Sequence, residues 1–142
     1  MNIADSVTIS ATADEVWRVF TDVERWPEWT ASVRSVEVTS GDGVALGARV
    51  RIKQPRLPKL VWEVTEVVPG VSWTWVSRSP GAVTTARHTV TPQGPGETLV
   101  AQSVEWTGPL GGLGRLYAGL TRRYLALEGA GLKARSEAAA RA

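Results

Sequence analysis

The first thirty residues contain a strand pattern, a helix start and a bulky aromatic corner in direct succession. Residues 3–10 form a short alternating pattern that predicts a strand. Thr12 followed by Glu15 predicts a capping box, so we expect a helix to begin there. In the sequence Trp-Pro-Glu-Trp at 26–29, the proline disfavours helical geometry at the preceding residue. A chain with this order is expected to place a helix and an aromatic corner against a sheet.

Six further strands are predicted after the aromatic corner. Turn signals rich in glycine and proline lie at 40–43, 69–70 and 92–96, and they predict three hairpins. The predicted strands cover residues 33–39, 48–53, 60–68, 71–77, 83–91 and 98–107. With the first strand, this gives seven strands in a mainly antiparallel order.

The end of the chain carries the pattern of a long helix. Apolar residues recur at spacings of three and four and predict one buried stripe: Leu113, Leu116, Tyr117, Leu120, Tyr124 and Leu127. Gly129 and Gly131 interrupt the pattern and mark either a bend or a close approach by another element. The glycine-rich segment before the helix is expected to act as a hinge for lid motion.

This order of elements resembles the helix-grip fold of the START and Bet v 1-like (SRPBCC) superfamily, and within it the polyketide cyclase/dehydrase and lipid-transport family. The resemblance is carried by VTISATADEVW at 7–17, Asp22 followed by WPEW at 26–29, EVTEVVPG at 63–70, GETLV at 96–100 and GLKARSE at 131–137. It implies an α+β fold in which a seven-stranded curved antiparallel sheet wraps around a long C-terminal helix, with two short helices after the first strand.

The resemblance also implies that residues 1–142 form a single ligand-binding domain, with a hydrophobic ligand held between sheet and helix. It implies no particular chemistry, because this fold supports carriers, receptors, cyclases and chaperone activators.

Composition excludes several other classes of function. The net charge is only +2 and the basic residues are scattered, so no nucleic-acid partner is expected. The chain has no cysteine and one histidine, which argues against disulfides and metal sites. Apolar runs are too short for an integral membrane segment. We expect a cytoplasmic protein without a cofactor, either a monomer or a homodimer.

The alternation of apolar residues along the predicted strands indicates which side chains face a cavity. Tryptophan side chains dominate this face, which suits an apolar or aromatic ligand. The alternative for several of them is simple core packing. The expected ligand-binding residues are Trp29, Trp62, Trp73, Trp75, Thr84, Gln102, Val104, Trp106, Leu120 and Tyr124.

His88 is the candidate catalytic residue. It is the only histidine and it shares the inward face of its strand, where it is either a proton-transfer group or a structural histidine. Glu66 shares the face of Trp62, so it is either a strand-end residue or a cavity acid. Glu63 and Glu105 fall on the opposite, solvated face.

Three functions remain open at this point. The first is intracellular binding of a small hydrophobic or aromatic ligand, such as a polyketide, a lipid or an isoprenoid-like molecule. The second is an aromatase/cyclase or dehydratase that works without metal and uses cavity shape together with His88 for proton transfer. The third is a protein-interaction module of the chaperone-activator type, which requires an exposed apolar patch.

Overall fold

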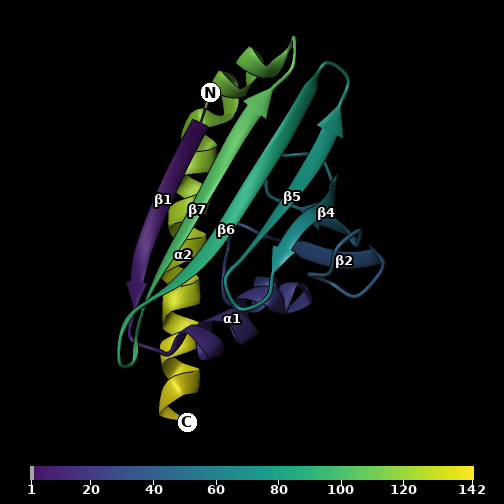
Figure 1. The fold of residues 1–142 in the computed structure, drawn as a ribbon. Coiled ribbons are helices and arrows are strands. Elements are labelled where there is room, and N and C mark those ends of the chain that lie inside the picture. The colour runs from purple at the N-terminus through teal and green to yellow at the C-terminus, as the bar shows by residue number, and fades with distance from the viewer. Residues whose placement is uncertain (1) are drawn as a thin grey trace.

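A seven-stranded antiparallel sheet curves around one long helix in the computed structural model, which describes residues 2–142 (Figure 1). The strands are β1 (Asn2–Ile9), β2 (Ser35–Ser40), β3 (Arg49–Lys53), β4 (Leu60–Val68), β5 (Ser72–Ser79), β6 (Ala82–Gly94) and β7 (Glu97–Thr107). The helices are α1 (Ala13–Thr21), η1 (Val23–Glu28), η2 (Gly111–Tyr117) and α2 (Ala118–Arg141). The strand order is β1-β7-β6-β5-β4-β3-β2, so the predicted fold class is confirmed.

The helical segment after β1 begins as the sequence indicates, but Pro27 lies inside a second, 3₁₀ helix and does not end the helical segment before Trp26. The Glu15 amide donates a hydrogen bond to Thr12 Oγ1 at 3.2 Å, and the Glu15 side chain accepts one from the Thr12 amide, which completes the capping box. The chain then tightens into the 3₁₀ helix η1, where the Trp26 indole N–H donates to the Phe20 carbonyl at 2.9 Å. This bond fixes the Trp26 ring inside the molecule.

A bulge in β4 changes which residues face inward. The register between β4 and β5 shifts between Val64 and Glu66, so Val67 packs against the core and Glu66 is exposed. The predicted shared face of Glu66 and Trp62 is therefore wrong, because the extra residue reverses the alternation. Glu66 is a surface residue near the end of its strand.

The buried face of α2 differs from the predicted stripe. Leu113 and Leu116 lie in η2 and are 54% and 77% exposed, because α2 begins only at Ala118. The buried residues of α2 are Ala118, Tyr124, Leu125, Glu128, Gly129, Leu132 and Ser136.

Helix α2 continues through both of its central glycines. A β-carbon at Gly131 would overlap the Trp29 carbonyl oxygen, so this position is a close contact between α2 and the aromatic corner. Among residues 2–142, no helix combines the length and the apolar character needed to cross a membrane.

Candidate functional site

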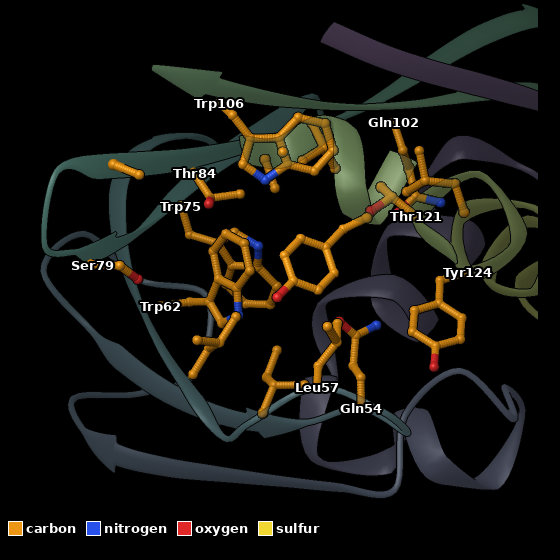
Figure 2. Close-up of a pocket in the computed structure, with 18 of the residues that line it drawn as sticks. Gln54, Leu57, Trp62, Trp75, Ser79, Thr84, Gln102, Trp106, Thr121 and Tyr124 are labelled. Atoms are coloured by element: carbon orange, nitrogen blue, oxygen red, sulfur yellow. The ribbon is translucent and has the colours of Figure 1, made fainter. Parts of the chain in front are cut away.

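A cavity of about 340 Å³ lies between the concave face of the sheet and α2 (Figure 2). The segment between β3 and β4 contributes Gln54, Leu57 and Pro58 to its wall. Helix η2 contributes Leu113 and Tyr117 from the other end of the sheet. The volume lies near the lower end of the range of about 300–1,000 Å³ that is usual for small-molecule sites.

Four tryptophan side chains form much of the apolar wall. Trp62 and Trp75 project from neighbouring strands, and their ring centroids are 5.9 Å apart (Figure 2). Trp26 reaches the same wall from η1, with its ring 5.7 Å from that of Trp75. Trp106 lines another part of the cavity, where η2 packs so closely on it that Gly114 has no room for a side chain. A planar apolar molecule would therefore meet ring faces on several sides.

The segment from 54 to 58 is tied to α2 at one point. The Tyr124 hydroxyl donates a hydrogen bond to the Pro55 carbonyl, and the Lys53 ammonium donates to the Leu57 carbonyl. Tyr124 therefore lines the cavity and also holds this segment in place. Its hydroxyl proton is donated to Pro55 and is not available to a ligand.

His88 and Gln102 face each other across β6 and β7 on the cavity wall. The His88 ring is stacked on Trp73 at 4.0 Å between centroids, and its Nδ1 lies 3.2 Å from the Trp73 carbonyl oxygen. A carbonyl only accepts, so Nδ1 carries the proton and Nε2 is left as an acceptor. Burial lowers the pKa of His88 to about 3, which outweighs the opposing effect of this hydrogen bond. His88 is therefore a neutral imidazole at physiological pH.

Gln102 is buried, and its carbonyl oxygen Oε1 has no hydrogen-bond partner within residues 2–142. Buried amide oxygens are seldom left without a donor, since the lost hydration is not recovered. A ligand in the adjoining cavity that carries a hydrogen-bond donor would satisfy this oxygen.

Glu128 is the functional candidate that the sequence reasoning missed. It projects from α2, lines the cavity and is only 6% exposed. Ser32 Oγ donates to its Oε2 at 3.1 Å, and Thr30 Oγ1 lies 2.8 Å from Ser32 Oγ. Burial raises the pKa of Glu128 to about 7, and the Ser32 hydrogen bond only partly opposes this. The spacing of four residues from Tyr124 places Glu128 on the same face of the helix, and this was the signal available in the sequence.

Eight of the predicted site residues lie on the cavity wall: Trp62, Trp75, Thr84, His88, Gln102, Val104, Trp106 and Tyr124. Three others are not among the lining residues. Trp73 is 1% exposed and enclosed by Phe20 and His88, whereas Trp29 packs beside Trp26 and against α2 at Gly131. Leu120 is half-buried and does not line the cavity, whereas the next residue of α2, Thr121, does. A role in ligand binding stays a prediction for all of these residues.

No set of three His, Asp or Glu side chains within residues 2–142 is placed to hold a metal ion. The lining residues include no lysine and no arginine. Within residues 2–142, Glu128 is thus the one side chain of the cavity wall that can carry a charge near neutral pH.

Comparison with known proteins agrees with this geometry. The family model described as polyketide cyclase/dehydrase and lipid transport matches residues 1–137. No curated protein sequence matches the chain at a significant level.

Several solved structures are similar to this one. An aromatase/cyclase, Zhui, from a Streptomyces species is 15% identical with a TM-score of 0.78, and the match covers 96% of this chain and 93% of that one. A protein from Thermus thermophilus is 23% identical with a TM-score of 0.77, covering 98% and 99%. A START superfamily protein from Mycobacterium smegmatis is 19% identical with a TM-score of 0.73, covering 96% and 97%. At these identities the likeness concerns the fold.

Proposed function

Because this chain belongs to the polyketide cyclase/dehydrase and lipid transport family, we propose that it is a cytoplasmic protein that encloses a small hydrophobic or aromatic ligand in the cavity between sheet and α2. The observation that carries the proposal is the tryptophan-lined cavity itself. In the core beside it, four side chains are fully buried and belong to one packed cluster: Trp73, Phe20, Ile9 and Leu132. A hollow beside such a packed core is a feature of ligand-binding sites.

The dimensions and lining favour a compact ligand. Transfer of apolar surface from water into the cavity provides the driving force, at roughly 25 cal/mol for each Å² buried. The wall is mostly apolar, and its buried polar side chains include His88, Gln102 and Glu128. A fused-ring or short-chain polyketide, lipid or isoprenoid-like molecule fits this pattern better than a long acyl chain.

The mouth of the cavity lies beside η2. Leu113 and Tyr117 line the cavity and are at the same time 54% and 46% exposed, so they connect its interior with solvent. The 3₁₀ helix to which they belong has no side-chain cap at its start. We propose that ligands enter here by a displacement of η2.

A cavity-filling variant tests the proposal. Thr121→Trp places a bulky ring from α2 into the hollow, whereas Ala126→Trp adds the same ring to an exposed position of the same helix. Native mass spectrometry of the freshly purified proteins, followed by solvent extraction, is expected to find an apolar adduct on the wild type and on Ala126→Trp, and to find it depleted on Thr121→Trp. Equal occupancy of the two variants, or a wild type that binds no apolar probe, would contradict the proposal.

A cyclase or dehydratase is the second candidate, and Glu128 is the observation that favours it. A carboxyl group whose pKa is about 7 can both give and take a proton at neutral pH, whereas His88 with a pKa of about 3 is a weak base there. In this alternative Glu128 transfers the proton and His88 accepts a hydrogen bond from the substrate.

Turnover of a synthetic β-polyketone thioester separates the two candidates. An enzyme is expected to lose roughly 100-fold or more in rate on Glu128→Gln. The substitution His88→Ala is expected to change the rate less. Turnover that is absent in the wild type would leave binding as the function, whereas turnover that is unchanged in Glu128→Gln would show that Glu128 does not transfer the proton.

A further inference from the structure

Three buried polar side chains on the cavity wall present hydrogen-bond acceptors that meet no donor from residues 2–142. His88 Nε2 is an acceptor because Nδ1 is bonded to the Trp73 carbonyl, and Gln102 Oε1 has no partner within residues 2–142. Glu128 accepts from Ser32 through Oε2 alone among the described residues, which leaves Oε1 free. A ligand that is complementary to this cavity therefore carries hydrogen-bond donors.

The side chains around Glu128 indicate that a ligand group bound to it should be positively charged. No lysine or arginine from the described chain lines the cavity, and the other titratable side chains on its wall are His88, Tyr117 and Tyr124. His88 is neutral at physiological pH, and the Tyr124 hydroxyl is bonded to Pro55. On β1, which packs against α2, Asp5 comes near Gly129, but it is exposed and does not line the cavity. A buried carboxylate without a cation is an unfavourable arrangement, and a bound cation would relieve it.

The hydroxyl pair behind Glu128 supports the carboxylate form. Ser32 Oγ donates its one proton to Glu128 Oε2, so in the contact between the two hydroxyls Thr30 Oγ1 is the donor and Ser32 Oγ the acceptor. Thr30 Oγ1 also accepts from the Ser32 amide. Both Thr30 and Ser32 are buried, so this orientation is held by the protein interior. With Oε2 held by this donor, Oε1 is the carboxylate oxygen that has no partner among residues 2–142.

The apolar wall is itself suited to a positive group. Indole rings attract cations through the negative potential of their faces, and tryptophan is the strongest of the aromatic side chains in this respect. Trp26, Trp62, Trp75 and Trp106 all line the cavity that Glu128 lines.

We propose that Glu128 anchors a protonated amine carried by a compact apolar or aromatic ligand, and that the cavity discriminates against ligands that carry a carboxylate. This inference rests on the proposed function, namely that the cavity binds a small apolar molecule. It adds the polar group by which such a molecule is recognised and oriented. A ligand carboxylate would meet no cation in the cavity and would lie near an acidic side chain.

Three probes on one ring system test the selectivity: naphthylethylamine, naphthylethanol and naphthylacetate. Their affinities are measured by isothermal titration calorimetry slightly above neutral pH, with the wild type, Glu128→Gln and Glu66→Gln. The glutamine at 128 keeps the shape of the side chain and removes its charge. Glu66→Gln removes the same charge from an exposed site and is the matched control.

The wild type is expected to bind the amine about 10- to 100-fold more tightly than the carboxylate, as befits a charged hydrogen bond in a buried site. Glu128→Gln is expected to reduce this ratio to near one through a loss of amine affinity, and Glu66→Gln is expected to leave it unchanged.

Each other outcome overturns a definite claim. If all three probes bind alike to the wild type, the cavity binds apolar molecules but Glu128 does not select amines. If the ratio survives in Glu128→Gln, another group provides the selectivity. If none of the probes binds, the proposed function fails for ligands of this size and the inference falls with it.

Discussion

The two ends of the concave sheet face are built from similar aromatic residues and yet serve different purposes. At the end near α1 (Figure 1), Phe20 from that helix packs edge-on against Trp73 with 4.7 Å between the ring centroids, and Trp73 is only 1% exposed. At the end near η2, Trp75 and Trp106 line the cavity. The covering element, and not the residue type, thus decides whether a tryptophan is core or wall. His88 lies at the boundary, since it stacks on Trp73 and also lines the cavity.

The largest expected effect is at the closed end. Trp73→Ala is expected to lower the free energy of unfolding by roughly 3–5 kcal/mol, because a large buried ring leaves a void that its neighbours cannot fill. Trp73→Phe is the control, since it keeps a ring and removes an indole N–H that has no partner among the described residues. Urea unfolding followed by circular dichroism measures both. A loss of less than about 1 kcal/mol in Trp73→Ala would mean that this end is not tightly packed.

Opposite effects of pH on stability are expected from the two buried titratable groups of the cavity wall, His88 and Glu128. The folded protein retains the Glu128 proton up to a pKa of about 7, whereas the unfolded chain releases it near 4.5, so stability falls as pH rises between these values. The pKa of His88 is lowered from 6.5 to about 3, so the unfolded chain takes up that proton first, and stability rises with pH between 3 and 6.5. Between 4.5 and 6.5 the two effects oppose each other.

A variant separates these two contributions. The difference in unfolding free energy between wild type and Glu128→Gln is expected to shift by roughly 3 kcal/mol against the wild type from pH 4.5 to above 7. Chemical unfolding at a series of pH values measures it. Parallel curves for the two proteins would show that the Glu128 carboxyl is hydrated, and that the cavity is wetter than its lining indicates.

A smaller effect is expected where α2 meets the aromatic corner. Gly131→Ala is expected to lower the free energy of unfolding by roughly 1–3 kcal/mol, because the new methyl group would displace the Trp29 backbone. Gly119→Ala is the matched control on the same helix, where a methyl group meets nothing within 4 Å. That control is expected to gain roughly 0.5–1 kcal/mol from helix propensity. If both variants gain stability, the contact at Gly131 is looser than described.

The sequence predicts the fold best where the alternation of inward and outward residues along a strand is not interrupted. Strands β6 and β7 pair without a register shift from Val83 to Pro92, so simple alternation predicts the inward face there, and Thr84, His88, Gln102 and Trp106 all line the cavity. In β4 the bulge reverses the alternation after Val64, and nothing in the local sequence marks it.

The helical side of the site was harder to predict for two physical reasons. The stripe from Leu113 onward was extended through residues that form a 3₁₀ helix, whose three-residue period rotates the face before α2 begins. Glu128 was overlooked because a polar residue on a buried face breaks the apolar pattern used to find that face. In the aromatic corner, the turn of η1 decides that Trp26 and not Trp29 reaches the cavity, and this turn depends on tertiary contacts.

The smallest stability effect is expected at the open end, together with the clearest effect on binding. Trp62→Ala enlarges a hollow that already exists, so it is expected to cost less free energy of unfolding than Trp73→Ala, while the affinity for naphthylethanol falls about tenfold through lost contact area. Calorimetric titration and urea unfolding of the two variants measure the contrast, with probe binding compared under conditions where both remain folded. Equal stability losses with unchanged affinity would mean that Trp62 is core rather than wall. Such a result would remove the distinction between the two ends, because tryptophans would then be core residues whether or not a helix packs on them.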